Sequence, residues 1–182
     1  MLIIWLLVLT IFWGYYFYNP DFVSAENLST FILKFKNHIL VTYAIMFILR
    51  PFTMLPGATF VIVGTIIFPT NLEVILILST CCELVSSSII YFFSDFMGFD
   101  EHFQRKFPKK MDYIKQKLES KSGFTFMLLW CSTPFTPSDL IFYLAGSLHI
   151  SYKKFIVAVF LGHIILYSIF VYFTDSILDV IR

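Results

Sequence analysis

Three charged residues lie inside apolar sequence and are the best candidates for chemistry in this 182-residue chain. Arg50 ends the apolar run ILVTYAIMFILR, Glu83 lies in the middle of a long apolar run, and Asp139 follows two prolines. Charges in such surroundings are costly, and they mark substrate or proton paths. A guanidinium there can hold a phosphate, and a buried carboxyl group can pair with a cation or exchange a proton. These three residues are therefore predicted to bind the substrate of a transport protein.

The composition indicates that the surrounding apolar sequence lies in a membrane. Hydrophobic residues make up 58% of the chain and charged residues only 14%, against about 25% charged residues in soluble domains. The 23 phenylalanines could not all be hidden in a soluble core of this size. A net charge of +1, without a basic patch interleaved with aromatic residues, argues against nucleic acid as a partner.

Arg50 and Glu83 each allow two interpretations. Arg50 could bind a lipid phosphate or an acidic side chain, or it could extend to the membrane interface. Glu83 could pair with Arg50 or exchange protons, or it could be a neutral, hydrogen-bonded carboxyl group. Ser79, Ser86 and Ser87 lie about one helical turn from Glu83 and would form a polar stripe with it.

Two further polar residues are also open to two interpretations. Asp139 could cap a half-helix that starts near Leu140, or it could contact the substrate or a proton. His163, which follows Gly162 in the last apolar run, is interpreted as a hydrogen-bonded packing residue, with proton relay as the alternative.

Two apolar stretches, 39–69 and 124–150, are each broken in the middle. Their halves are about 10 to 12 residues long, half of what a spanning helix needs. Each stretch is predicted to be a re-entrant hairpin, with a single kinked span as the alternative, because broken backbone in a membrane must be surrounded by protein or water. The residues assigned to the hairpin tips are Pro51, Pro56, Gly57, Pro134, Pro137 and Gly146.

The rest of the chain completes one membrane domain, 1–182. Spanning helices are predicted at 2–18, 72–93 and 155–174, with a short interfacial helix within 19–37. A cleaved signal peptide is the alternative for the first run, although it lacks a basic start. The connector 95–123 carries seven lysines and arginines and is predicted to lie in the cytoplasm. Its part after Pro108 is predicted to be an amphipathic helix on the membrane surface, with a solvated charged connector as the alternative.

The two broken stretches resemble each other. Arg50–Gly57 aligns with Cys131–Ser138, which places Pro56 on Pro137, and Gly64 falls on Gly146 one residue later. Paired, interrupted segments of this kind are typical of transporter sites. If both stretches are hairpins separated by the single span 72–93, the second hairpin enters from the opposite face, and the repeat is inverted.

The second stretch also carries a family resemblance. The residues Pro134, Pro137, Asp139, Leu140, Tyr143, Ala145 and Gly146 are similar to a pattern of the DedA/VTT superfamily, the SNARE-associated Golgi proteins. Pro56-Gly57, Gly64 and Phe68-Pro69 resemble the first hairpin of that family, and Ile90–Ser94 with Gly98 resembles its middle helix.

The resemblance implies two facing re-entrant hairpins among spanning helices, in proteins that move lipids between leaflets. Cys131 stands where many members have an arginine, and Pro137 where the bacterial DedA branch often has another. The acidic residues of that branch's first hairpin have no match. The chain therefore resembles the VTT/Tvp38-like branch more closely.

We therefore expect a translocator of phospholipid or polyprenyl phosphate in a bacterial cytoplasmic membrane, with a polar pocket between two hairpins. A proton- or ion-coupled solute transporter and a non-transporting scaffold are the alternatives. No enzyme signature is found, and Cys81, Cys82 and Cys131 lack metal-site spacing, so no enzyme activity, cofactor or metal is expected. The expected partners are membrane lipids, protons or ions, and a second copy of the chain.

Overall fold

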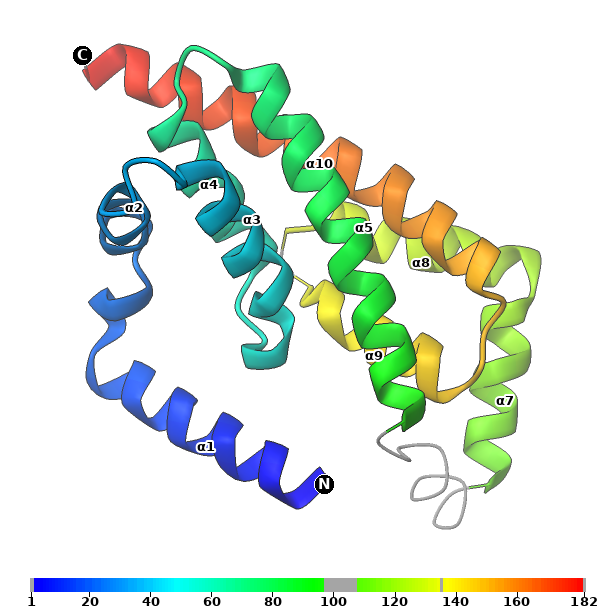
Figure 1. Cartoon of the computed structure of the whole chain (residues 1–182). Coiled ribbons are helices and arrows are strands. Elements are labelled where there is room, and N and C mark those ends of the chain that lie inside the picture. Colours follow the sequence, from blue (N-terminus) through cyan, green and yellow to red (C-terminus); the bar gives the residue numbers. More distant parts are fainter. Residues whose placement is uncertain (1, 97–107, 135, 182) are drawn as a thin grey trace. The chain divides into compact units, whose positions relative to one another are not determined.

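The computed structural model describes residues 2–96, 108–134 and 136–181, and every regular element in these ranges is a helix (Figure 1). The predicted all-α fold class is confirmed for them. The part of the predicted connector at 97–107, with Gly98, lies outside the described residues. The chain divides into two compact units. The first contains the chain up to Cys82 and its last part from Tyr167, and the second runs from Glu83 to Leu166.

The first unit contains a short helix and a broken pair of helices. The Ser24 side chain accepts a hydrogen bond from the Asn27 N–H at 3.2 Å and so caps the short helix α2. Helix α3 ends before Pro51, which has no N–H to donate, and α4 begins directly after Pro56. The elements are α1 (Leu2–Tyr18), the 3-10 helix η1 (Pro20–Val23), α2 (Ala25–Leu33), α3 (Ile39–Leu49), η2 (Arg50–Thr53) and α4 (Gly57–Ile67).

The second unit contains a second broken pair, and two long helices pass through both units. Helix α8 begins at Lys121 rather than at the predicted 124, because Ser120 caps it by accepting a hydrogen bond from the Gly123 N–H at 3.1 Å. The two long helices extend beyond the predicted spans. The elements are α5 (Leu72–Phe96), α7 (Pro108–Glu119), α8 (Lys121–Ser132), α9 (Ser138–Ser147) and α10 (Tyr152–Ile181).

Helix α5 has many polar residues on its buried side and mainly apolar residues on its exposed side. Glu83 is fully buried, whereas Ile77 is 64% exposed. A soluble protein has the opposite arrangement, so this polarity indicates a helix whose outer side faces lipid. The buried polar residues of this helix are Ser79, Thr80, Glu83, Ser86, Ser87 and Ser94, and the exposed apolar ones are Val74, Ile77, Val85, Ile89 and Phe92.

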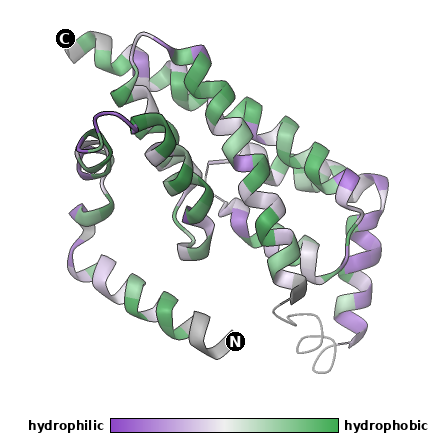
Figure 2. Ribbon diagram, viewed as in Figure 1, coloured by the Kyte–Doolittle hydropathy of each residue, from purple (hydrophilic) through white to green (hydrophobic). Residues whose placement is uncertain are grey.

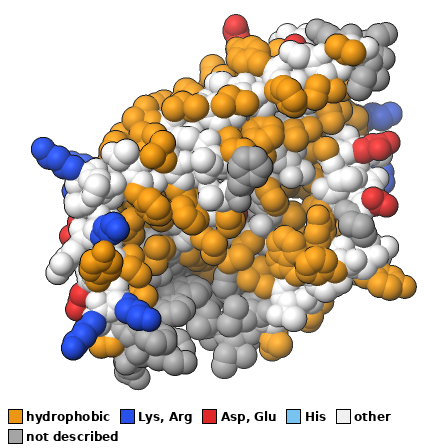
Figure 3. All heavy atoms as spheres, turned by 180° about the vertical axis from the view of Figure 1, so that it is seen from behind, with side chains coloured by type: hydrophobic (Ala, Val, Ile, Leu, Met, Phe, Trp, Pro, Cys, Tyr) orange, Lys and Arg blue, Asp and Glu red, His pale blue; other side chains and the backbone are white. Residues whose placement is uncertain are grey.

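Two helices of the described chain are long and apolar enough to cross a membrane, within Leu72–Ser94 of α5 and Tyr152–Leu178 of α10. Both are mainly hydrophobic in Figure 2, whereas α7 is mainly hydrophilic. Hydrophobic side chains cover most of the face seen in Figure 3, and its charged side chains gather toward the margins. This distribution suits a protein surrounded by hydrocarbon.

Aromatic side chains form the core of the first unit. The Phe47 ring contacts Tyr43, Phe60 and Tyr167, with centroid distances of 5.9, 5.6 and 6.1 Å. The Tyr43 hydroxyl donates to the Phe60 carbonyl at 3.1 Å and lies 2.8 Å from Ser79 Oγ. Helices α3 and α4 therefore lie against each other and against α5, with the buried hydroxyl satisfied.

Glycines allow the helices of the second unit to approach closely. Gly146 of α9 lies against the Tyr91 carbonyl and Ser94 Oγ of α5. A Cβ atom at Gly162 of α10 would lie 2.5 Å from Cys131 Cβ and 2.9 Å from the Leu128 carbonyl oxygen. Small residues at such crossings are the usual way for membrane helices to pack without a hydrophobic driving force.

We predict that Gly162→Ala destabilises the protein by about 1–3 kcal/mol, because the added methyl group overlaps α8. Gly14→Ala is the matched control, since a Cβ at Gly14 meets nothing within 4 Å. It should be neutral or stabilising by up to about 1 kcal/mol. Unfolding of both variants by sodium dodecyl sulfate in mixed micelles measures the effect. Equal midpoints for the two variants would show that α8 and α10 do not pack closely at Gly162.

Candidate functional site

Each unit contains one part of the predicted site. Arg50 lies in the first unit, at the break between α3 and α4. Glu83 and Asp139 lie in the second, on α5 and at the start of α9. All three side chains are buried, with exposed fractions of 2%, 0% and 3%. Buried charges at broken or spanning helices are the groups expected to contact a substrate or a proton.

Arg50 is held in place by the backbone and side chains around it. Its Nη1 donates a hydrogen bond to the Leu55 carbonyl at 2.8 Å, and its guanidinium lies over the Phe47 ring at 5.2 Å from the centroid. A Cβ atom at Gly57 would lie 2.8 Å from Arg50 Nη2, so only glycine leaves room for the guanidinium. The orientation of this cation is therefore set by the fold.

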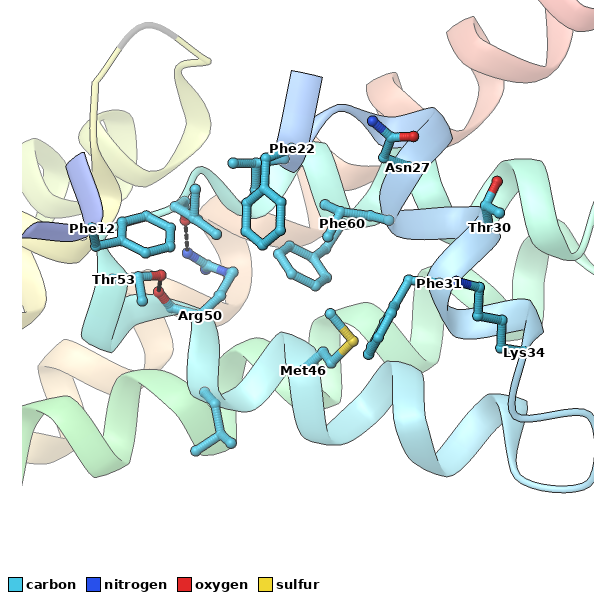
Figure 4. Close-up of a pocket in the computed structure, with 14 residues that line it drawn as sticks. Phe12, Phe22, Asn27, Thr30, Phe31, Lys34, Met46, Arg50, Thr53 and Phe60 are labelled. Carbon is cyan, nitrogen blue, oxygen red and sulfur yellow. Dashed lines mark hydrogen bonds between the residues drawn. The ribbon is translucent and has the colours of Figure 1, made fainter. Parts of the chain in front are cut away.

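A cavity of about 520 Å³ lies beside Arg50 (Figure 4). Its walls are mainly aromatic and aliphatic, and helices α1, α2, α3 and α4 and η1 all contribute to them. The size and the mainly apolar lining of this cavity are typical of a site for an apolar or amphiphilic molecule. The lining residues are Phe12, Phe22, Val23, Asn27, Leu28, Thr30, Phe31, Lys34, Met46, Leu49, Arg50, Thr53, Leu55 and Phe60.

In the second unit, Glu83 faces His163. Glu83 Oε1 and His163 Nε2 are 3.3 Å apart, and both side chains are about 1% exposed. His163 Nδ1 lies 3.0 Å from the Val159 carbonyl oxygen. A carbonyl oxygen only accepts, so Nδ1 carries a proton and Nε2 faces the carboxyl group. A hydrogen bond between Nε2 and the carboxyl group therefore needs one further proton, carried either by the carboxyl group or by the imidazole.

Asp139 is not the N-cap residue of α9, because the helix starts two residues before the predicted position near Leu140. The helix begins at Ser138, with the extended Pro137 as its N-cap and the Leu140 N–H bonded to the Pro137 carbonyl at 3.2 Å. Asp139 is the second helical residue, where its charge is still favoured by the helix dipole. Like Glu83 and His163, Asp139 is buried within the second unit.

The predicted tip residues lie at the two breaks or directly beyond them. Pro56 and Pro137 each occupy the N-cap of the helix that follows, so they are equivalent in the two units. Pro51 is buried and Pro134 is exposed. Gly146 is the exception, because it lies near the end of α9. Among the residues that the structure describes, no group of three His, Cys, Asp or Glu side chains could hold a metal ion.

Two threonines were missed by the sequence analysis. The Thr53 hydroxyl donates to the Arg50 carbonyl at 2.7 Å, and the Thr136 hydroxyl donates to the Trp130 carbonyl at 2.8 Å. Both satisfy carbonyl groups that the breaks release from helical bonding. The signal was available in the sequence, because Pro-Phe-Thr occurs at 51–53 and again at 134–136. Aligning Pro56 on Pro137 puts these triplets two residues out of register.

The fold and the two polar sites define a helical membrane protein with paired helix breaks. The family model of the VTT domain matches residues 55–176. The chain belongs to the VTT-domain family, whose members are membrane proteins, as the sequence resemblance predicted. Neither the search of curated proteins nor that of solved structures finds a match.

We predict that the Glu83–His163 pair contributes a measurable coupling energy to stability. Glu83→Gln and His163→Gln should each destabilise by about 1–3 kcal/mol, because each leaves its partner with a poorer hydrogen bond in a buried site. The double variant should lose less than the sum, with a coupling of about 0.5–3 kcal/mol. Unfolding in detergent of the unaltered protein, the two single variants and the double variant gives the four free energies of this double-mutant cycle.

Glu73→Gln is the matched control for this cycle, because Glu73 is exposed in the first turn of the same helix. Its effect should stay within about 0.5 kcal/mol. Strict additivity of Glu83→Gln and His163→Gln would mean that the two side chains do not interact.

Proposed function

We propose that this protein moves lipids between the two leaflets of a membrane and that it does so without chemical catalysis. The observation that carries the proposal is the buried guanidinium of Arg50 beside an apolar cavity, in a member of a membrane family. An arginine in an apolar site can hold a phosphate by charge-assisted, bidentate hydrogen bonds. The hydrocarbon chains of the same lipid need only apolar surroundings. The substrate class is therefore an anionic lipid, either a phospholipid or a polyprenyl phosphate.

The lengths of the broken helices support re-entrant hairpins. Helices α3 and α4 have 11 residues each, and α8 and α9 have 12 and 10. At 1.5 Å per residue each is only about 15–18 Å long, against about 30 Å of hydrocarbon. We propose that each pair enters the membrane and returns to the side from which it came. Since α5 crosses once between the pairs, they enter from opposite faces as an inverted repeat.

The membrane in question is proposed to be a bacterial cytoplasmic membrane, which the chain crosses several times. Seven lysines and arginines in the connector 95–123 support a cytoplasmic location for that segment. The substrate lipids of the proposal are present in such a membrane.

The Glu83–His163 pair favours a second candidate function, transport of a small solute coupled to protons. Two titratable groups 3.3 Å apart in a buried site can exchange one proton with a passing substrate or with water. Such a transporter would depend on a pH gradient. A lipid scramblase would not, because it only equilibrates the leaflets.

We predict that the purified protein translocates labelled lipid in liposomes and that Arg50→Gln slows this about tenfold or more. The expected loss corresponds to one or two charge-assisted hydrogen bonds to phosphate. Arg50→Lys should retain part of the activity, since it keeps the charge but not the planar fork. Lys36→Gln is the control, because Lys36 is exposed.

The experiment compares phosphatidylglycerol, phosphatidylcholine and a polyprenyl phosphate, with and without a pH gradient. Unfolding midpoints of the variants separate loss of function from loss of fold. No translocation above that of empty vesicles for any lipid would overturn the proposal. A solute flux that requires the gradient and vanishes in Glu83→Gln would establish the second candidate instead.

We predict the sidedness of four exposed positions from the re-entrant arrangement. In a variant without native cysteines, Asn37→Cys and Asn71→Cys should react with an impermeant maleimide from one side of the membrane. Ser122→Cys and Ser151→Cys should both react from the other side. Labelling of right-side-out and inverted vesicles measures this. If Asn37→Cys and Asn71→Cys react from opposite sides, the first broken pair spans the membrane and is not re-entrant.

A further inference from the structure

The cavity in the first unit has the shape of a binding site in its own right. Its volume of about 520 Å³ is within the range of about 300–1,000 Å³ for small-molecule sites. Residues from six elements line it, from Phe12 on α1 to Phe60 on α4 (Figure 4). A cavity built from so many elements is a feature of the folded unit rather than a gap beside one side chain.

The walls and the ends of the cavity differ in character. Phe22, Phe60 and Met46 lie along its middle, while Arg50 lies near one end and Lys34 near the other (Figure 4). None of its 14 described lining residues is acidic. An apolar cavity whose only charged residues are cationic matches a molecule that has a hydrocarbon chain and an anionic group.

We propose that this cavity binds one hydrocarbon chain of an anionic membrane lipid, with the acidic group of that lipid on Arg50. This inference rests on the proposed function, because it takes the bound lipid to be the lipid that the protein transports. It adds that the protein recognises the lipid by a chain as well as by its head group. A transported lipid would then have one chain inside the protein while its head group is bound.

Arg50 suits the acidic group better than Lys34 does. Arg50 is 2% exposed, and its guanidinium is oriented by the Leu55 carbonyl and the Phe47 ring. Lys34 is exposed, so its amine is hydrated and its charge is screened. A charge-assisted hydrogen bond is stronger in the less polar surroundings of Arg50. The hydrocarbon chain of the lipid then extends from Arg50 past Phe60 and Met46 toward the end of the cavity at Lys34.

A photoreactive lipid tests the placement directly. The probe is an oleoyl lysophosphatidate with a diazirine in its chain, added to the full chain in nanodiscs of phosphatidylcholine. After irradiation, mass spectrometry should locate the label on peptides that contain Phe22, Phe31 or Met46. A monoacylglycerol probe with the same chain, which lacks the phosphate, should label about tenfold less at equal concentration, since it loses the charge-assisted bond.

Two tryptophan variants of α2 form a matched pair. Thr30→Trp fills the cavity from its lining and should reduce labelling by the lysophosphatidate at least fivefold. Leu33→Trp adds the same side chain to the same helix at an exposed position outside the lining and should leave labelling unchanged. Arg50→Gln should raise the probe concentration for half-maximal labelling about tenfold, as expected for loss of a charge-assisted bond, whereas Lys34→Gln should change it less than twofold.

Each other outcome overturns part of the inference. Undiminished labelling of Thr30→Trp would show that the chain does not enter the cavity. A loss in Lys34→Gln and not in Arg50→Gln would show that the acidic group binds at the other end. Lipid translocation that persists while the cavity remains unlabelled would overturn this inference and leave the proposed function standing. Labelling of the cavity in a protein that translocates no lipid would overturn the proposed function and leave lipid binding in the cavity standing.

Discussion

The structure depends on one constraint: polar groups removed from water must find their partners within the protein. Helix α5 shows its effect most clearly, because Ser79, Glu83 and Ser86 are fully buried while Ile77 is largely exposed. Burying a carboxyl group is tolerated only with a partner, and His163 is 3.3 Å away. Gly162, beside that histidine, lets α10 lie against Cys131 of α8. The close packing of α10 against α8 thus lies next to the residue that faces Glu83.

The same constraint explains the chemistry of the two helix breaks. A break releases carbonyl groups from helical bonding, and in hydrocarbon no water replaces them. In the first unit, Arg50 and Thr53 donate to two of these carbonyls. In the second, the Trp130 carbonyl accepts from the Thr133 and Thr136 hydroxyls at 3.0 and 2.8 Å. The polar residues at the breaks therefore stabilise the backbone there.

The fold was more predictable from sequence than the site, for a physical reason. Helix breaks depend on local residues, so Pro51, Pro56 and Pro137 mark them directly. The partner of Glu83 depends on which distant helix packs against α5, so the sequence offered His163 only as a packing residue or a proton relay. The position of Asp139 was misjudged because α9, with the extended Pro137 as its N-cap, starts two residues earlier than expected. Periodicity and proline content in a sequence indicate local structure. A functional site, in contrast, is formed when residues from distant helices pack together.

Arg50 combines the structural and the proposed functional role in one side chain. Its hydrogen bond to Leu55, its place over Phe47 and the space left by Gly57 orient the guanidinium without any ligand. In the proposed function, a phosphate would therefore meet a preorganised donor. A lysine at this position could supply a positive charge. Its ammonium group, however, would lack the planar guanidinium, which can donate to the Leu55 carbonyl and face the cavity at the same time. The residue that closes the first helix break is therefore also the one best suited to bind an anionic lipid.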